Sequence, residues 1–423
     1  MMRTISALLL SFYTSLLLAS PLEIVMWHSM AGGLGNEVNQ LVQAFNQSQS
    51  DYAVKAVYKG EYTDSLTSFA ASFRAHKPPA MVQVFEVGTA TMLSPAGIIK
   101  PVHELMREQQ MTLPEQDFLP AVRAFYSKSG QLQAMPFNIS VPLVFYNADA
   151  LAHVGWSEQN FPTTWQGMES LAAQLIQAGY PCAYTSAYPA WIQMESFSAL
   201  HALPLVNAHN RAVYNHSALI GHLERLKSWQ NRHYMKYGGR TSDATVLFTS
   251  GHCAMFSQSS GSYASMAALV KFRLGVAALP MDANVQTARH NNVAGGAALW
   301  AVAGQSPQTY RGIAAFFAYL ARPDVQWHWH EQTGYIPIGL TGIYEQKPGQ
   351  KAQPSLAIAR LDLANAEEKP FSPYRIPLNQ IRMINDEALE AVFAGIKTPQ
   401  VALNDAVERA DFVLGRFLRN AGE

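Results

Sequence analysis

Ala80-Met-Val-Gln-Val-Phe85 is an almost continuous apolar run of the length of one strand, and it decides the fold class of this chain. A strand that is apolar along its length is buried on both faces, which is typical of sheets covered by helices on both sides. Two further strands precede it at 22–27 and 52–58, and apolar residues at helical spacing separate the three over 38–45 and 65–75. This order predicts an α/β protein that begins with a parallel, doubly wound sheet.

A second and a third block continue the alternation of strands and helices. Thr163-Thr-Trp-Gln166 has the spacing of a capping box at the start of a helix. Gly295-Gly296 opens the third block, and Thr398-Pro399 begins the last helix with proline at its first position. The remaining elements are expected as strands at 181–185, 253–257, 274–279 and 299–302, as helices at 165–175, 312–320, 383–393 and 399–414, and as an exposed loop at 346–354.

The bulk composition bounds the size and the partners of the protein. Its 423 residues exceed what one hydrophobic core usually supports, so two lobes are expected. Hydrophobic residues make up 49% and charged residues 14%, which is typical of a globular protein. Thirty basic and thirty acidic side chains cancel, so we expect no nucleic acid and no anionic membrane among the partners.

The N-terminus has the pattern of a secretory signal peptide over residues 1–20. Arg3 precedes an apolar run, and the small residues Ala19 and Ser20 end it. No second run approaches the ~20 apolar residues that a spanning helix needs, so a soluble mature protein is expected. Neither cysteine lies near the cleavage region, where a lipid anchor would require one. The expected location is therefore the periplasm, without a lipid anchor.

The two cysteines, Cys182 and Cys253, leave two interpretations open. An oxidising compartment would permit a disulfide bond between them, and two small buried thiols are the alternative. Metal binding is disfavoured because no further ligands accompany them at the spacing of a zinc site.

The sequence contains none of the common catalytic or nucleotide-binding motifs that we sought. It has no Gly-x4-Gly-Lys-Ser/Thr loop, no Gly-x-Gly-x-x-Gly after a strand and no Gly-x-Ser-x-Gly elbow. His328-Trp-His-Glu331 could hold a metal and His28 could act as a base, but packing and a hydrogen bond at a strand end are the ordinary roles of such residues. We expect a protein that is not an enzyme and has no metal or cofactor.

A series of motifs along the whole mature chain resembles a known family. The series consists of Trp27-His-Ser-Met30, Tyr58-Lys-Gly-Glu-Tyr62, Gln83-Val-Phe-Glu-Val-Gly-Thr-Ala-Thr-Met92, Pro136-Phe-Asn138, Trp191-Ile-Gln-Met-Glu195, Cys253-Ala-Met255, Ser259-Ser-Gly-Ser262, Gly295-Gly-Ala-Ala-Leu-Trp300, Thr333-Gly-Tyr-Ile-Pro337, Gln380-Ile-Arg382 and Lys397-Thr-Pro-Gln400. Their order and spacing resemble the extracellular solute-binding proteins of ABC importers, in particular the members that bind glycerol 3-phosphate.

The resemblance implies a maltose-binding-protein-like fold with two α/β lobes, each built on a doubly wound sheet, and a ligand cleft between them. The first lobe would comprise 21–139 and 296–342, and the second 140–295 and 343–423. The lobes would close on a small-molecule ligand by a hinge motion and present it to the inner-membrane permease subunits of the importer. We expect the protein to act as a monomer.

The resemblance also implies the residues of the ligand site. Arg382 would supply a cation for phosphate, because its planar fork matches two phosphate oxygens. Ser259 and Gly296 would add hydrogen-bond donors, and Glu86 would accept from glycerol hydroxyls and repel a misplaced phosphate. The full expected set is Tyr62, Glu86, Ser140, Tyr188, Trp191, Ser259, Gly296, Tyr335 and Arg382. The alternatives for its members are an ordinary turn residue, a core tyrosine, a surface arginine and, for Glu86, a capped or salt-bridged loop glutamate.

Two departures from the family pattern bear on the ligand. The family's Gly-Trp-x-Gly-Trp-Ile-Gln reads Ala187-Tyr-Pro-Ala-Trp-Ile-Gln193 here, so Tyr188 replaces the first tryptophan, and Pro-Gln-Ile-Arg reads Asn379-Gln-Ile-Arg382. The smaller, more polar Tyr188 leads us to hypothesise a glycerol end that admits glycerophosphodiesters such as glycerophosphocholine. A binder of a sugar or other polyol, which would not need Arg382, and a secreted phosphodiesterase, which would need a metal cluster or an activated nucleophile, are the alternatives.

Overall fold

The computed structural model describes residues 20–94, 96–340, 353–363 and 376–421. The predicted signal peptide, except for its last residue, and most of the predicted loop at 346–354 lie outside the described residues. Within the described part of the chain, no helix has both the length and the apolar character that a membrane crossing requires.

The first sheet contains the three strands that the sequence predicts at the start of the chain. Leu22–His28 (β1) pairs in parallel with Tyr52–Tyr58 (β2) and Met81–Phe85 (β3). Gly295–Ala301 (β11) then runs antiparallel to both β3 and Met135–Ser140 (β6), in the order β2-β1-β3-β11-β6. The prediction of a parallel sheet is therefore correct only for the first three strands. β11 begins beside the end of β3 and so runs in the opposite direction.

The second sheet is also mixed. Cys182–Ser186 (β8) is parallel to Cys253–Ser259 (β9), whereas Pro142–Asn147 (β7) is antiparallel to β9 and to Leu274–Ala278 (β10). The order is β10-β7-β9-β8. Cys182 and Cys253 are disulfide-bonded and join the first residues of two neighbouring strands, so in this structure they are not free thiols.

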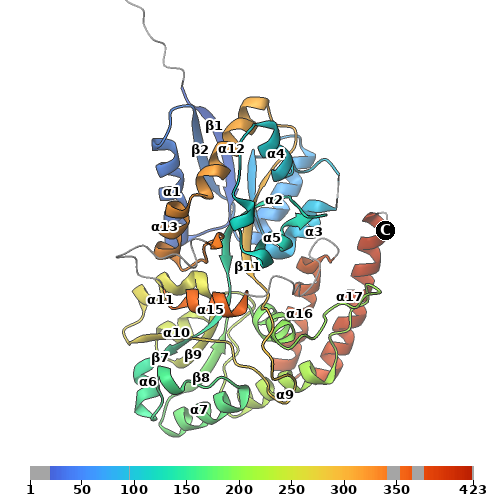
Figure 1. The fold of residues 1–423 in the computed structure, drawn as a ribbon. Helices are drawn as coiled ribbons and strands as arrows, with labels where there is room; N and C mark the ends of the chain where they lie inside the picture. The colour runs from blue at the N-terminus through green and yellow to red at the C-terminus, as the bar shows by residue number, and fades with distance from the viewer. Residues whose placement is uncertain (1–19, 95, 341–352, 364–375, 422–423) are drawn as a thin grey trace, which may run out of the picture.

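Helices cover both sheets and give the molecule its two lobes (Figure 1). With the first sheet lie Gly32–Gln47 (α1), Tyr62–Arg74 (α2), Thr89–Leu93 (α3), Val102–Glu108 (α4), Pro120–Phe125 (α5), Pro307–Leu320 (α12), Pro323–Thr333 (α13) and the hairpin Ser127–Lys128 (β4) with Gln131–Leu132 (β5). With the second sheet lie Ala148–His153 (α6), Trp165–Gln177 (α7), Phe197–Leu200 (α8), Ser217–Asn231 (α9), Thr245–Thr249 (α10), Tyr263–Leu269 (α11), Ser355–Asp362 (α15), Leu378–Phe393 (α16) and Pro399–Ala421 (α17).

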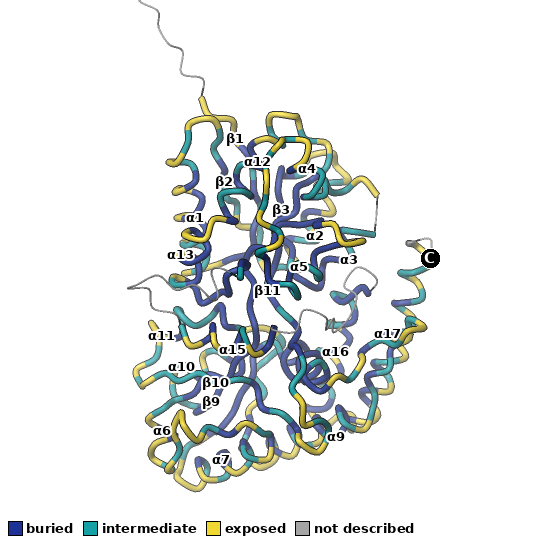
Figure 2. The backbone as a smooth tube through the Cα atoms, in the orientation of Figure 1, coloured by how far each residue is buried: buried dark blue, intermediate teal, exposed yellow. Residues whose placement is uncertain are grey.

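Both sheets are buried along most of their length (Figure 2). One apolar cluster fills the first lobe and continues onto α10, α11 and α15, while a second packs α7, α9, α16 and α17 on the opposite face of the second sheet. The chain passes from β6 through Val141 into β7 and returns to the first sheet at Gly295. The predicted division into 21–139 with 296–342 and 140–295 with 343–423 stays a prediction for the chain as a whole.

Two helix starts differ from the sequence prediction. The cap of α7 is Thr164, whose Oγ1 accepts from the Gly167 N–H at 3.1 Å, and not Thr163. The Thr163 carbonyl instead accepts from the N–H of Met281 at 2.9 Å, which takes Thr163 out of the helix. The helix expected around 38–45 begins earlier, because Gly32–Gly35 already form the first turn of α1.

Candidate functional site

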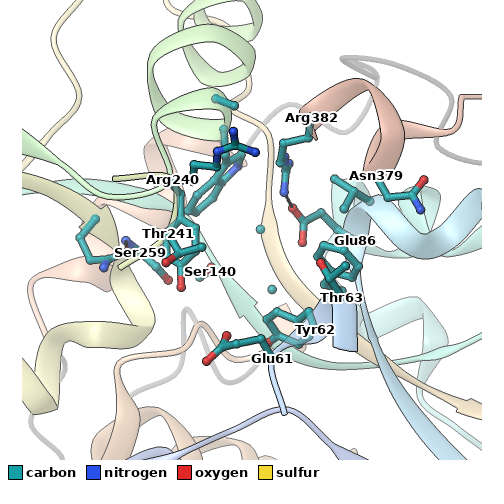
Figure 3. Close-up of a pocket in the computed structure, with 18 of the residues that line it drawn as sticks. Glu61, Tyr62, Thr63, Glu86, Ser140, Arg240, Thr241, Ser259, Asn379 and Arg382 are labelled. Carbon is teal, nitrogen blue, oxygen red and sulfur yellow. Dashed lines mark hydrogen bonds and ion pairs between the residues drawn. The ribbon is translucent and has the colours of Figure 1, made fainter. Parts of the chain in front are cut away.

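A cavity of about 240 Å³ lies between the lobes, and all nine predicted ligand residues line it. Figure 3 shows the residues that it labels facing a shared open space, with Tyr62, Glu86 and Arg382 across from Ser140 and Ser259. The volume falls somewhat below the roughly 300–1,000 Å³ of typical ligand pockets, which suits a small molecule. The lining also includes Glu61, Phe85, Arg240, Thr241, Asn379 and Asp386, which the sequence analysis did not single out as ligand residues.

The first lobe places a carboxylate and two tyrosines at the cavity. Glu86 follows β3 directly, in a single 3-10 turn, and is only 5% exposed. The ring of Tyr62, at the start of α2, stacks on Phe85 with the ring centroids 5.2 Å apart. Burial raises the pKa of Tyr62 well above its usual value and also raises that of Tyr335. Both hydroxyls therefore keep their protons at neutral pH.

The second lobe supplies the two aromatic residues that follow β8. Trp191 lies in a π-helical segment, Ala190–Ser196, and its Nε1–H donates to the Val293 carbonyl at 3.2 Å. A Cβ atom on Gly295 would lie 2.4 Å from the Trp191 ring, so only glycine fits there. The Tyr188 ring packs edge-on against Trp191, 6.5 Å away between centroids. The indole is thus held against the strand that crosses between the lobes.

Three small residues lie where the chain passes between the lobes. Ser140 ends β6, and Ser259 ends β9 opposite Pro142 of β7. The Ser259 Oγ accepts from the Gly261 N–H at 3.2 Å, which leaves its own proton available to a ligand. Gly296 has a φ of +102°, a conformation that glycine adopts without steric cost.

Arg382, the expected cation of the site, is not free of partners. Its Nε and Nη2 donate to the two carboxylate oxygens of Glu195 at 2.9 and 2.6 Å, and its Nη1 donates to Glu86 Oε1 at 2.6 Å (Figure 3 shows Arg382 beside Glu86). The Arg382 side chain is 17% exposed, so it is not a surface arginine either. One positive charge is shared between two buried carboxylates.

Glu195 is the residue that the sequence analysis missed. It is 1% exposed and lies in the apolar segment that also carries Trp191. A carboxylate in such a segment requires a charged partner. A glutamate within an apolar stretch was therefore the sequence signal that could have identified Glu195. Burial raises the pKa of Glu86, and Arg382 opposes that rise. Burial also disfavours the charge on Arg382, but Glu195 and Glu86 together raise its pKa. An anion in this cavity therefore needs donors besides Arg382.

Asp386 lies one turn after Arg382 on α16 and also lines the cavity. Its Oδ1 is buried and has no hydrogen-bond partner among the described residues. Burial raises the pKa of Asp386 to about 7, and Arg382 and Arg240 oppose the rise. The Arg240 guanidinium is held by both carboxylate oxygens of Glu390, at 2.7 and 2.5 Å. Asp386 is thus a carboxylate that titrates near neutral pH inside the cavity.

Asp386→Asn should remove part of the pH dependence of stability. The folded-state pKa of Asp386, about 7, lies above the roughly 3.9 of an unfolded chain. The wild type therefore loses stability as the pH rises from about 4 to about 7, and the loss is complete above that range. A difference of about 3 pKa units corresponds to at most about 4 kcal/mol, so the variant should be more stable by up to that amount at pH 8 and equal at pH 4.

Urea denaturation of both proteins across pH 4–8 measures this difference. Asp405→Asn is the control, because Asp405 is exposed on α17 in a pair with Lys397 and should change stability little. Parallel pH profiles for wild type and Asp386→Asn would show that Asp386 does not titrate as described.

Two of the histidines that the sequence singled out, His28 and His330, have structural partners. His28 Nδ1 accepts from the Met30 N–H at 3.3 Å, and His330 Nδ1 lies 2.8 Å from the Tyr335 carbonyl oxygen. Within the described ranges, no group of three or more His, Cys, Asp or Glu side chains has an arrangement that could hold a metal.

Two α/β lobes with a cavity between them, lined from both sides by aromatic, charged and hydroxyl side chains, define the class of two-lobed solute-binding proteins. Solved structures of this class share the fold. They include maltose-bound MalE3 of T. maritima (TM-score 0.79, 17% identity, 93% of this chain and 100% of that chain covered) and UgpB from Mycobacterium tuberculosis in complex with glycerophosphocholine (TM-score 0.77, 18% identity, 94% and 99% covered).

The chain belongs to the family of bacterial extracellular solute-binding proteins, whose family model matches residues 40–355. It is 40% identical over 417 residues to the sn-glycerol-3-phosphate-binding periplasmic protein UgpB of Yersinia pseudotuberculosis serotype I (strain IP32953), with 93% of each chain covered. It is likewise 40% identical over 409 residues to the protein of that name from Pectobacterium atrosepticum, with 93% of this chain and 92% of that one covered.

Proposed function

We propose that this protein is the substrate-binding component of an ABC importer and that it binds glycerol 3-phosphate, glycerophosphodiesters or both. The observation that carries the proposal is that all nine residues expected from the glycerol-3-phosphate-binding members line one cavity between the lobes. The 40% identity to periplasmic proteins named for this ligand supports it. The protein acts by binding and delivery, without catalysis.

The groups in the cavity suit the two ends of such a ligand. Ser259, the Gly296 backbone and the tyrosine hydroxyls donate to the phosphate, and Arg382 adds positive charge at close range. Glu86 accepts from the glycerol hydroxyls, and Ser140, Tyr188 and Trp191 complete the wall. Residues 1–20 direct export to the periplasm, where the mature monomer, without a lipid anchor, delivers its ligand to the inner-membrane permease subunits.

One observation favours a second candidate, a binder of a neutral polyol or sugar. Arg382 is already paired with Glu86 and Glu195, and carboxylates are good acceptors for hydroxyl groups. This pairing weakens the argument that an arginine in the cleft must serve a phosphate. The two candidates differ in whether an anion is required for binding.

Isothermal titration calorimetry of the unfolded and refolded protein tests the proposal. We expect saturable one-to-one binding of glycerol 3-phosphate, and no binding of glycerol alone at the same concentration. Glycerophosphocholine in excess should displace glycerol 3-phosphate, because Tyr188 leaves more room than the family's tryptophan. Tyr188→Trp should lower the affinity for glycerophosphocholine about tenfold relative to the affinity for glycerol 3-phosphate, a difference of about 1.4 kcal/mol. Binding of ribitol or maltose but of no phosphate compound would establish the second candidate, and failure of glycerophosphocholine to compete would remove the diester.

A further inference from the structure

A chain of buried hydrogen bonds leads from the first strand to the cavity. The Ser29 N–H donates to Gln83 Oε1 at 2.8 Å, and Gln83 Nε2 donates to Asn138 Oδ1 at 2.8 Å. Asn138 Nδ2 then donates to the Tyr62 hydroxyl at 3.0 Å. Gln83 is 1% exposed and Asn138 is not exposed at all, so water does not compete for the first two of these bonds.

The sheet brings these side chains together. Gln83 lies on β3 and Asn138 on β6, with β11 between them. Asn138 pairs with Ala297 of β11, and Ala297 pairs in turn with Phe85, on which Tyr62 stacks. Gln83 itself pairs with Leu299, two positions along β11 from Ala297, so the two amides meet diagonally across β11.

The first hydrogen bond of this series decides which group donates and which accepts in each of the others. A backbone N–H can only donate, so the oxygen of Gln83 must face Ser29 and its NH₂ group must face Asn138. Asn138 must then accept through its oxygen, which turns its own NH₂ group toward the cavity. The Tyr62 oxygen accepts one of these hydrogens, at 3.0 Å.

We propose that Gln83 and Asn138 are positioning residues that make Tyr62 a hydrogen-bond donor toward the ligand, and so select an anionic group at this end of the cavity. A hydroxyl that accepts from Asn138 has its own proton free to donate into the cavity. Because Arg382 is shared by two carboxylates, such an oriented neutral donor carries the preference for an anion. This inference rests on the proposed function, in which the ligand carries a phosphate.

Gln83→Glu should reverse the direction of these hydrogen bonds with almost no change in side-chain volume. The introduced carboxylate, when ionised, would accept from the Ser29 N–H and also from the Asn138 NH₂ group, so Asn138 would turn its oxygen toward Tyr62. The Tyr62 hydroxyl would then donate to Asn138 and present only lone pairs to the phosphate. When protonated, the introduced carboxyl group can donate to Asn138, which restores the original direction. The effect on the ligand should therefore appear only at a pH where this group is ionised.

The measurement is the dissociation constant of glycerol 3-phosphate for Gln83→Glu, divided by that of wild type, from pH 5 to pH 9. We expect a ratio near 1 at low pH that rises about 10- to 100-fold at high pH, the size of one or two unsatisfied buried groups. Taking the ratio cancels the titration of the ligand and of Asp386. Asn138→Asp, which also places an acceptor beside the Tyr62 hydroxyl when ionised, should behave in the same way and provides the test if Gln83→Glu does not fold.

Gln326→Glu is the matched control. Gln326 is also buried in the first lobe and also accepts from a backbone N–H, that of Ile338, at 2.8 Å, but it does not line the cavity. The dissociation constant of glycerol 3-phosphate for Gln326→Glu, divided by that of wild type, should stay constant with pH. A constant ratio for the folded Gln83→Glu or Asn138→Asp variant, with wild type binding normally, overturns the positioning role alone. Absence of glycerol 3-phosphate binding by wild type overturns the proposed function, and the positioning role with it.

Discussion

Replacing Arg382 with alanine should destabilise the protein by about 3–5 kcal/mol, the usual cost of removing one partner from a buried ion pair. The variant leaves Glu86 and Glu195 buried, at 5% and 1% exposure, without the guanidinium that both contact. The variant should also bind glycerol 3-phosphate less favourably, by about 2–5 kcal/mol of binding free energy, because an anion would then face uncompensated carboxylates. Urea denaturation and calorimetry measure the two losses separately.

A second substitution separates stability from ligand binding. Glu195→Gln in the Arg382→Ala background removes one of the two unpaired charges, so stability should recover in part, while affinity for the phosphate should not. A polyol ligand, in contrast, should bind the double variant almost as well as the wild type. Arg322→Ala is the control, because Arg322 pairs with Asp324 on the surface, with both side chains more than half exposed, and should cost at most about 1 kcal/mol. A loss below that size for Arg382→Ala would contradict the arrangement described here.

Gly296→Ala should cost more than about 4 kcal/mol and abolish ligand binding. A Cβ atom at this position would lie 1.8 Å from the Asn138 carbonyl oxygen, a backbone atom that cannot turn aside. Relief would require β11 and β6 to separate where Gly296 pairs with Ile139, next to the register shift at Ala297. Ser140, the last residue of β6, follows this pairing directly and lines the cavity. Displacing β6 from β11 would therefore move the ligand site as well.

Gly304→Ala isolates the steric part of that effect. Gly304 also has a positive φ, +81°, but a Cβ atom there would meet nothing within 4 Å. It should therefore cost only the ~1–2 kcal/mol of a left-handed alanine and leave ligand affinity unchanged. Thermal unfolding of both variants, with and without glycerol 3-phosphate, makes the comparison. Equal losses for the two would show that the contact with Asn138 does not constrain Gly296.

The sequence predicted the parts of this protein that depend on local patterns. Strand period and apolar runs located β2 and β3, with bounds within one residue of those observed. Motif order then led to the family and to nine residues that meet at one cavity. The antiparallel direction of β11 was not predicted, because a strand pattern is the same in both directions and only the path of the chain between the lobes decides it.

The partners of the charged and polar groups could be decided only by the tertiary structure. Arg382 and Glu195 are 187 positions apart, and Gln83 and Asn138 are 55 apart, so no local spacing links them. A resemblance identifies Arg382 as a cation near the ligand, but the two carboxylates beside it decide how much of its charge is left for an anion. The sequence by itself therefore determined the fold class, the family and nine of the cavity residues, because these follow from local periodicity and motif order. The tertiary structure decided the electrostatics of the cavity and the direction of its hydrogen bonds, because both depend on groups that only folding brings into contact.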